Sequence, residues 1–121
     1  MTSGCILSYG YDSSLMFSRS MILRNAGYEV IEVYSYEDAL RFARSDVVDL
    51  VLICHTVSER QQVRLIHAIK KHRRLMPVFS IADTDLLVAV GEAMVVNSAP
   101  ELLLHSIQMA ISDYSSGSIA A

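Results

Sequence analysis

The residues best able to do chemistry lie where predicted strands end. Cys54 and His55 follow one apolar run, and Asp12 closely follows another. A thiolate at Cys54 would be a nucleophile or a redox sensor if its surroundings favoured the ionised form. The simpler interpretation is that Cys54 packs as a small apolar side chain, as free cysteines usually do. A Cys54–His55 dyad is not predicted, because successive side chains of a strand point to opposite faces.

Other potential ligands and charged groups do not assemble into a site. His67, His72 and His105 lie on two predicted helices without the spacing of metal ligands, so we expect no metal and no cofactor. The basic run at residues 70–74 suits a helix end, where cations complement the helix dipole. The net charge of −3 and the absence of a recognition motif argue against binding to nucleic acid.

The composition indicates one globular domain. The chain has 121 residues, of which 52% are hydrophobic, enough to build a core. The longest apolar stretch, residues 47–54, contains Asp49 and is too short to span a membrane, and no signal-peptide pattern is present. Cys5 and Cys54 are expected about 15 Å apart at opposite ends of the sheet, so no disulfide is predicted. We expect a cytoplasmic protein that does not bind membranes.

The spacing of apolar residues predicts strands that alternate with helices. Strands are expected at residues 5–9, 29–34, 47–54, 77–81 and 93–96, with helices near residues 14–25, 35–44, 58–74 and from 98 or 99 onward. This order predicts an α/β domain with a doubly wound parallel sheet, whose function lies at the carboxyl ends of the strands. The domain is expected to cover residues 1–113, and the small, polar residues 114–121 to form a flexible tail.

The same segments resemble a bacterial response-regulator receiver domain. The likeness begins at residues 6–30, ILSYGYDSSLMFSRSMILRNAGYEV, and continues in SYEDAL, DLVLIC and PVFSIA. It extends from residue 5 to about residue 113 and rests on hydrophobic pattern and spacing. The resemblance implies a flavodoxin-like, five-stranded parallel sheet of order 2-1-3-4-5. It also implies descent from two-component phosphorelay signalling, without an output domain.

The residues that receivers use for phosphoryl transfer are replaced in this chain. The family binds Mg²⁺ with an acidic pair, accepts the phosphoryl group on an aspartate, and contacts it with a Ser or Thr and a Lys. The matching positions are Gly10 and Tyr11 (with Asp12 one place further), Cys54, Ala82, and Ser98 or its neighbour Asn97. With at most one carboxylate and no lysine, this degenerate pocket is expected not to balance an acyl phosphate, and no cation is expected beside Cys54. We therefore expect no enzymatic activity.

Two functions remain open at this point. The first is a stand-alone pseudo-receiver that signals through protein contacts without phosphorylation. The alternative is a thiol-based sensor or small-ligand binder that uses Cys54 in the former phosphorylation pocket. A third possibility, a residual response to phosphodonors through Asp12, has the least support.

The segment before the last predicted strand suggests self-association. Residues 83–90 are about half as many as receivers use there, so the fourth helix is expected to be shortened or missing. Its loss would expose apolar sheet surface that a second copy could cover. The sequence therefore predicts a homodimer, with Leu86, Leu87, Val88 and Leu103 as possible interface residues.

Overall fold

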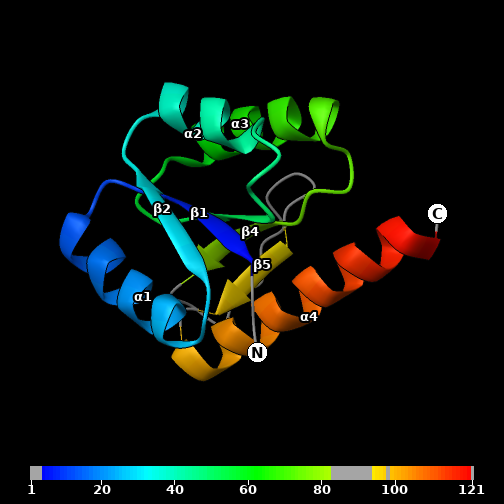
Figure 1. Ribbon diagram of the computed structural model, residues 1–121. Coiled ribbons are helices and arrows are strands. Elements are labelled where there is room, and N and C mark those ends of the chain that lie inside the picture. The colour runs from blue at the N-terminus through cyan, green and yellow to red at the C-terminus, as the bar shows by residue number, and fades with distance from the viewer. Residues whose placement is uncertain (1–3, 83–93, 98, 121) are drawn as a thin grey trace.

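The domain is built on one twisted parallel sheet. The computed structural model describes residues 4–82, 94–97 and 99–120 (Figure 1). The strands are β1 (Cys5–Tyr9), β2 (Glu29–Val33), β3 (Leu50–Ile53), β4 (Val78–Ala82) and β5 (Met94–Asn97). They pair in the order β2-β1-β3-β4-β5, and every neighbouring pair is parallel. This is the strand order that the resemblance to receiver domains implied.

Helices cover both faces of the sheet. They are α1 (Ser13–Asn25), α2 (Tyr36–Ala43), α3 (Glu59–His72) and α4 (Pro100–Ala120). Figure 1 shows α1 and α4 on one face and α2 and α3 on the other, so the predicted doubly wound α/β class is confirmed. Within the described part of the chain, no helix has the length and apolar character needed to cross a membrane.

Polar side chains start the helices at the expected places. Asp12, Ser35 and Ser58 each accept a hydrogen bond from a backbone N–H in the first helical turn. These bonds satisfy donors that a helix cannot pair internally, and so they fix where α1, α2 and α3 begin. Gly27, with φ of 101°, ends α1 in a conformation that favours glycine.

Two apolar clusters hold the layers together. One joins the sheet to α2 and α3 and includes Leu7, Tyr9 and Leu65, and the other joins it to α1 and α4 and includes Ile6 and Leu103. Side chains that alternate along β1 therefore enter different clusters, as the period of a strand requires. This double coverage accounts for the near-continuous apolar sequence of the central strands.

Two boundaries differ from the sequence prediction. Strand β3 begins at Leu50, and Val47 lies before it with 61% of its surface exposed. Helix α4 continues to Ala120, through residues that were expected to form a tail outside the domain. In Figure 1 its last turns extend past the sheet. The predicted loss of the fourth receiver helix falls on residues 83–93, outside the described residues.

Candidate functional site

The carboxyl ends of β1 and β3 bring the predicted pocket positions together. Tyr9 pairs with Ile53, so the next residues, Gly10 and Cys54, lie side by side, and the Cys54 N–H donates to the Tyr9 carbonyl at 2.8 Å. A Cβ placed on Gly10 would lie 2.7 Å from the Cβ of Cys54 and 3.0 Å from its sulfur. Glycine is therefore required for this close approach, and no carboxylate fits at position 10 without movement of the chain.

Tyr11 closes the site through a chain of hydroxyl contacts. Its N–H donates to Oγ1 of Thr56 at 3.0 Å, and its hydroxyl donates to Oε1 of Gln61 at 2.8 Å. Because the Tyr11 proton is used on Gln61, the 2.7 Å contact with Tyr9 has the Tyr9 hydroxyl as donor. Burial raises the pKa of Tyr9 far above its ordinary value, and the Tyr11 hydroxyl adds to the effect. Tyr9 therefore acts as a neutral hydrogen-bond donor.

Asp12 has a structural task. Its Oδ1 accepts the N–H of Leu15 at 3.1 Å, which caps α1. A carboxylate at this position also lies favourably at the positive end of the helix dipole. The carboxylate of Asp12 is thus engaged in starting a helix.

A buried arginine occupies the centre of the site. Arg19 of α1 has only 6% of its surface exposed, and its Nη1 donates to the sulfur of Cys54 at 2.8 Å. Cys54 itself is fully buried. No carboxylate in the described ranges forms an ion pair with Arg19. The expectation that no cation lies beside Cys54 is therefore wrong.

The sequence contains a signal that could have found Arg19. It lies three residues after Met16 and four before Leu23, both of which are fully buried. That spacing places Arg19 on the inward stripe of α1. A charge on such a stripe requires a partner, and the nearest strand end supplies Cys54.

The remaining pocket positions are only partly described. Ala82 ends β4 and pairs with Asn97 of β5, which places both backbones at the carboxyl edge. Ser98 lies outside the described residues. Across the described ranges, no three His, Cys, Asp or Glu residues come close enough to hold a metal ion. Gly10, Tyr11 and Cys54 offer no carboxylate oxygen, the ligand that Mg²⁺ prefers.

The other cysteine has the opposite surroundings. Cys5 begins β1, and its N–H donates to Oδ2 of Asp49 at 2.8 Å. Burial raises the pKa of the Cys5 thiol, and the negative charges of Glu29 and Asp49 raise it further. Neither cysteine forms a disulfide.

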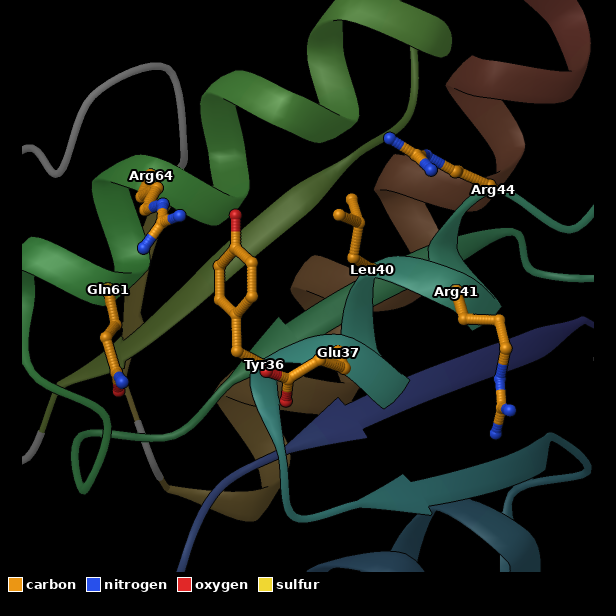
Figure 2. Close-up of a pocket in the computed structure, with 7 residues that line it drawn as sticks. All are labelled: Tyr36, Glu37, Leu40, Arg41, Arg44, Gln61 and Arg64. Atoms are coloured by element: carbon orange, nitrogen blue, oxygen red, sulfur yellow. The ribbon is translucent and has the colours of Figure 1, made fainter.

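An open hollow lies between α2 and α3, next to the site. Its volume is about 560 Å³, and it is lined by Tyr36, Glu37, Leu40, Arg41, Arg44, Gln61 and Arg64. Figure 2 shows Tyr36 and Leu40 pointing from α2 toward α3. Arg64 stacks over the Tyr36 ring with Cζ 5.2 Å from its centroid, while Arg41 is paired with Asp38. Gln61 belongs to both the hollow and the Tyr11 chain, so the two features are continuous.

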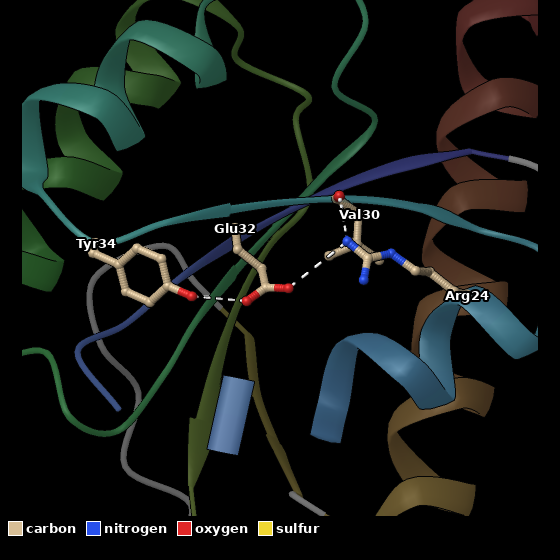
Figure 3. Close-up of polar contacts among 4 residues, drawn as sticks. All are labelled: Arg24, Val30, Glu32 and Tyr34. Atoms are coloured by element: carbon tan, nitrogen blue, oxygen red, sulfur yellow. Dashed lines mark hydrogen bonds and ion pairs between the residues drawn. The ribbon is translucent and has the colours of Figure 1, made fainter. Parts of the chain in front are cut away.

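A smaller hollow beside α1 has its charge already neutralised. It measures about 360 Å³ and includes Phe17, Glu32 and Tyr34. Glu32 accepts the Tyr34 hydroxyl at 2.8 Å and pairs with Arg24 at 3.7 Å, as Figure 3 shows. Its carboxylate is engaged, so this hollow offers little to a ligand.

The predicted interface residues require one correction. Leu103 is 2% exposed and packs with Ile107 in the cluster beneath α4, so it belongs to the core. The apolar side chains that α4 does expose include Leu102 and Met109. Leu86, Leu87 and Val88 lie outside the described residues.

Comparison with known proteins assigns the fold. A receiver domain protein of Methanospirillum hungatei matches with a TM-score of 0.79 and 19% identity, over 96% of this chain and 99% of that one. The receiver domain of the sensor kinase PA1611 from Pseudomonas aeruginosa, solved with magnesium in its active-site cleft, gives 0.73 and 19% over 92% and 99%. The fold is that of a response-regulator receiver domain. No family model and no curated protein matches the sequence.

Proposed function

We propose that this chain is a receiver-like domain of two-component signalling that acts through protein contacts and without phosphorylation. The carrying observation is the buried contact between Arg19 and Cys54 at the position where receivers accept the phosphoryl group. The guanidinium of Arg19, a side chain of this domain, therefore lies where a phosphoryl group would bind in a receiver.

The chemistry of phosphoryl transfer supports this proposal. The reaction needs an accessible carboxylate, a metal ion to bridge phosphate oxygens and a cation to stabilise the transition state. Here the acceptor position is a fully buried thiol, and Gly10 has no room for a side chain. Asp12 caps α1. The crowding at Gly10 and Cys54 leaves no open acceptor there, so signalling would depend on binding to a protein partner.

The described surface offers one region suited to such a partner. The hollow between α2 and α3 presents Arg44 and Arg64 around Leu40 and Tyr36. Neither arginine has a carboxylate partner in the described ranges, so an acidic protein segment with an apolar side chain would complement the hollow.

Self-association through residues 86–88 remains part of the proposal. Light scattering of wild type and Leu87→Glu tests it, with a dimer expected only for the wild type.

The alternative, a thiol-based sensor or small-ligand binder at Cys54, is favoured by the same contact with Arg19. A cation beside a cysteine promotes the reactive thiolate. The full burial of Cys54 opposes rapid reaction with bulky reagents, so only small reactants suit this function.

Incubation with acetyl phosphate and Mg²⁺, followed by intact-mass spectrometry, tests the main proposal. A receiver domain with a complete acidic pocket serves as the positive control. We expect a phosphoryl adduct on the control and none on this chain. A Mg²⁺-dependent adduct on this chain would overturn phosphorylation independence.

A further inference from the structure

The buried guanidinium of Arg19 requires a negative partner. Arginine stays protonated at every pH that a protein tolerates, and a charge removed from water must be paired. The polar contact of Arg19 in the described structure is the Cys54 sulfur at 2.8 Å. A neutral thiol is a weak acceptor, whereas a thiolate balances the charge fully.

The surroundings of Cys54 strengthen this argument. Gly10 at the end of β1 and Met16 of α1 pack close to Cys54, and both residues are uncharged. His55 follows Cys54 in the chain, and its side chain is exposed. The nearby hydroxyls of Tyr9 and Tyr11 are bonded to each other, and Tyr11 also bonds to Gln61. The guanidinium of Arg19, in contact with the sulfur at 2.8 Å, favours the charged form of Cys54.

We infer that Cys54 is a thiolate in the folded protein, paired with Arg19, and that it is the chain's site of modification by small hydroperoxides. This inference rests on the alternative function, a thiol-based sensor at Cys54, and specifies its chemistry. The acetyl phosphate experiment tests the main proposal, phosphorylation independence, separately. Each function can therefore fail alone.

The reaction needs a hydroperoxide as oxidant and no other reactant. The thiolate sulfur attacks the terminal peroxide oxygen, so an S–O bond forms as the O–O bond breaks. Sulfur loses two electrons, and the leaving oxygen takes a proton from solvent to become water when the oxidant is hydrogen peroxide. The product is a sulfenic acid whose oxygen can accept a hydrogen bond from Arg19.

Oxidation at this position would also change the conformation. The sulfur already lies so close to Gly10 that not even a Cβ fits there. An oxygen added on the side of the sulfur that faces Gly10 would displace the Gly10–Asp12 segment or the start of α1. Both lie at the carboxyl ends of the strands, the end at which receiver-type folds place function.

The first test measures ionisation in the Cys5→Ser background, where Cys54 is the remaining thiol. Ultraviolet absorbance of the thiolate is followed from acidic to alkaline pH, with Cys5→Ser/Cys54→Ser as the blank. We expect the absorbance of the Cys54 thiolate to be present at neutral pH. It should be lost in the Arg19→Met variant and retained in the Arg19→Lys variant, which keeps a cation. Circular dichroism verifies folding. A titration near the ordinary thiol value of about 8.5 with Arg19 present would overturn the inference.

The second test measures modification of the wild-type protein. Hydrogen peroxide is added with dimedone, which traps sulfenic acid, and peptides are analysed by mass spectrometry. We expect the adduct on Cys54 and none on Cys5, with a rate about tenfold or more lower in Arg19→Met, because each pKa unit changes the thiolate fraction about tenfold. An adduct on Cys5 alone, or on neither cysteine, would refute the modification site.

Discussion

The two ends of the sheet each carry a buried cysteine, but in opposite electrostatic surroundings. Cys5 opens β1 and belongs to the cluster beneath α2 and α3, near the carboxylates of Asp49 and Glu29. Cys54 follows β3 and touches the guanidinium of Arg19 from α1, on the other face. Both side chains are more than nine-tenths buried. Burial alone would keep both thiols neutral. The ionisation states of Cys5 and Cys54 therefore differ because anions lie near Cys5 and a cation lies near Cys54.

The largest expected effect comes from separating the buried pair. Cys54→Ala should destabilise the fold by roughly 3–5 kcal/mol, because it leaves the Arg19 charge buried without a partner. Arg19→Met should cost far less, since an apolar side chain of similar length removes the charge itself. Urea denaturation of both variants measures the difference. If Arg19→Met cost as much as Cys54→Ala, the pair would not be charged as described.

A smaller effect is expected from Gly10. Gly10→Ala should destabilise by about 1–3 kcal/mol through overpacking against Cys54 and Met16. The same denaturation assay applies, with Ser18→Ala, an exposed helix position, as the control. A Gly10→Ala protein as stable as the wild type would mean that the end of β1 has room to move. The former pocket would then be more open than its packing indicates.

The smallest expected effect concerns Cys5 and alkaline pH. The pKa of Cys5 is raised above its ordinary value, first by burial and then by Glu29 and Asp49. Its contribution to stability is therefore complete below the unfolded pKa and is lost as pH rises through the folded pKa. Cys5→Ser should show a shallower loss of stability above about pH 8.5 than the wild type. Identical alkaline profiles would contradict the neutral state of Cys5.

Local signals were sufficient to predict the architecture. Helices were predicted from residues 35 and 58, where the side chains of Ser35 and Ser58 accept the N–H groups of Asp38 and Gln61. Apolar runs covered on both faces indicated central parallel strands, and the observed order agrees. Helix α4 was cut short in the prediction because residues 114–120 are small and polar. Composition of that kind favours fraying but does not forbid helix.

The candidate site was predicted only in part. The adjacency of Gly10 and Cys54 follows from strand register, which the pattern of the sheet determines. The sequence prediction considered only residues at the ends of strands and did not include Arg19. This side chain reaches the site from the second turn of α1. Leu103 was misplaced because one apolar helix residue can face either the core or a partner. Such assignments depend on how helices rotate against the sheet, which sequence spacing alone determines loosely.

The central claim is that the carboxyl end of this receiver fold is packed shut and cannot take a phosphoryl group. Thermal unfolding with beryllofluoride and Mg²⁺, which together mimic the phosphoryl group, tests it most directly. A ligand that binds only the folded state must raise the unfolding midpoint. The account predicts no shift at ligand concentrations that stabilise a receiver with a complete acidic pocket. A Mg²⁺-dependent rise in the midpoint, abolished in Cys54→Ala or Asp12→Asn, would contradict it.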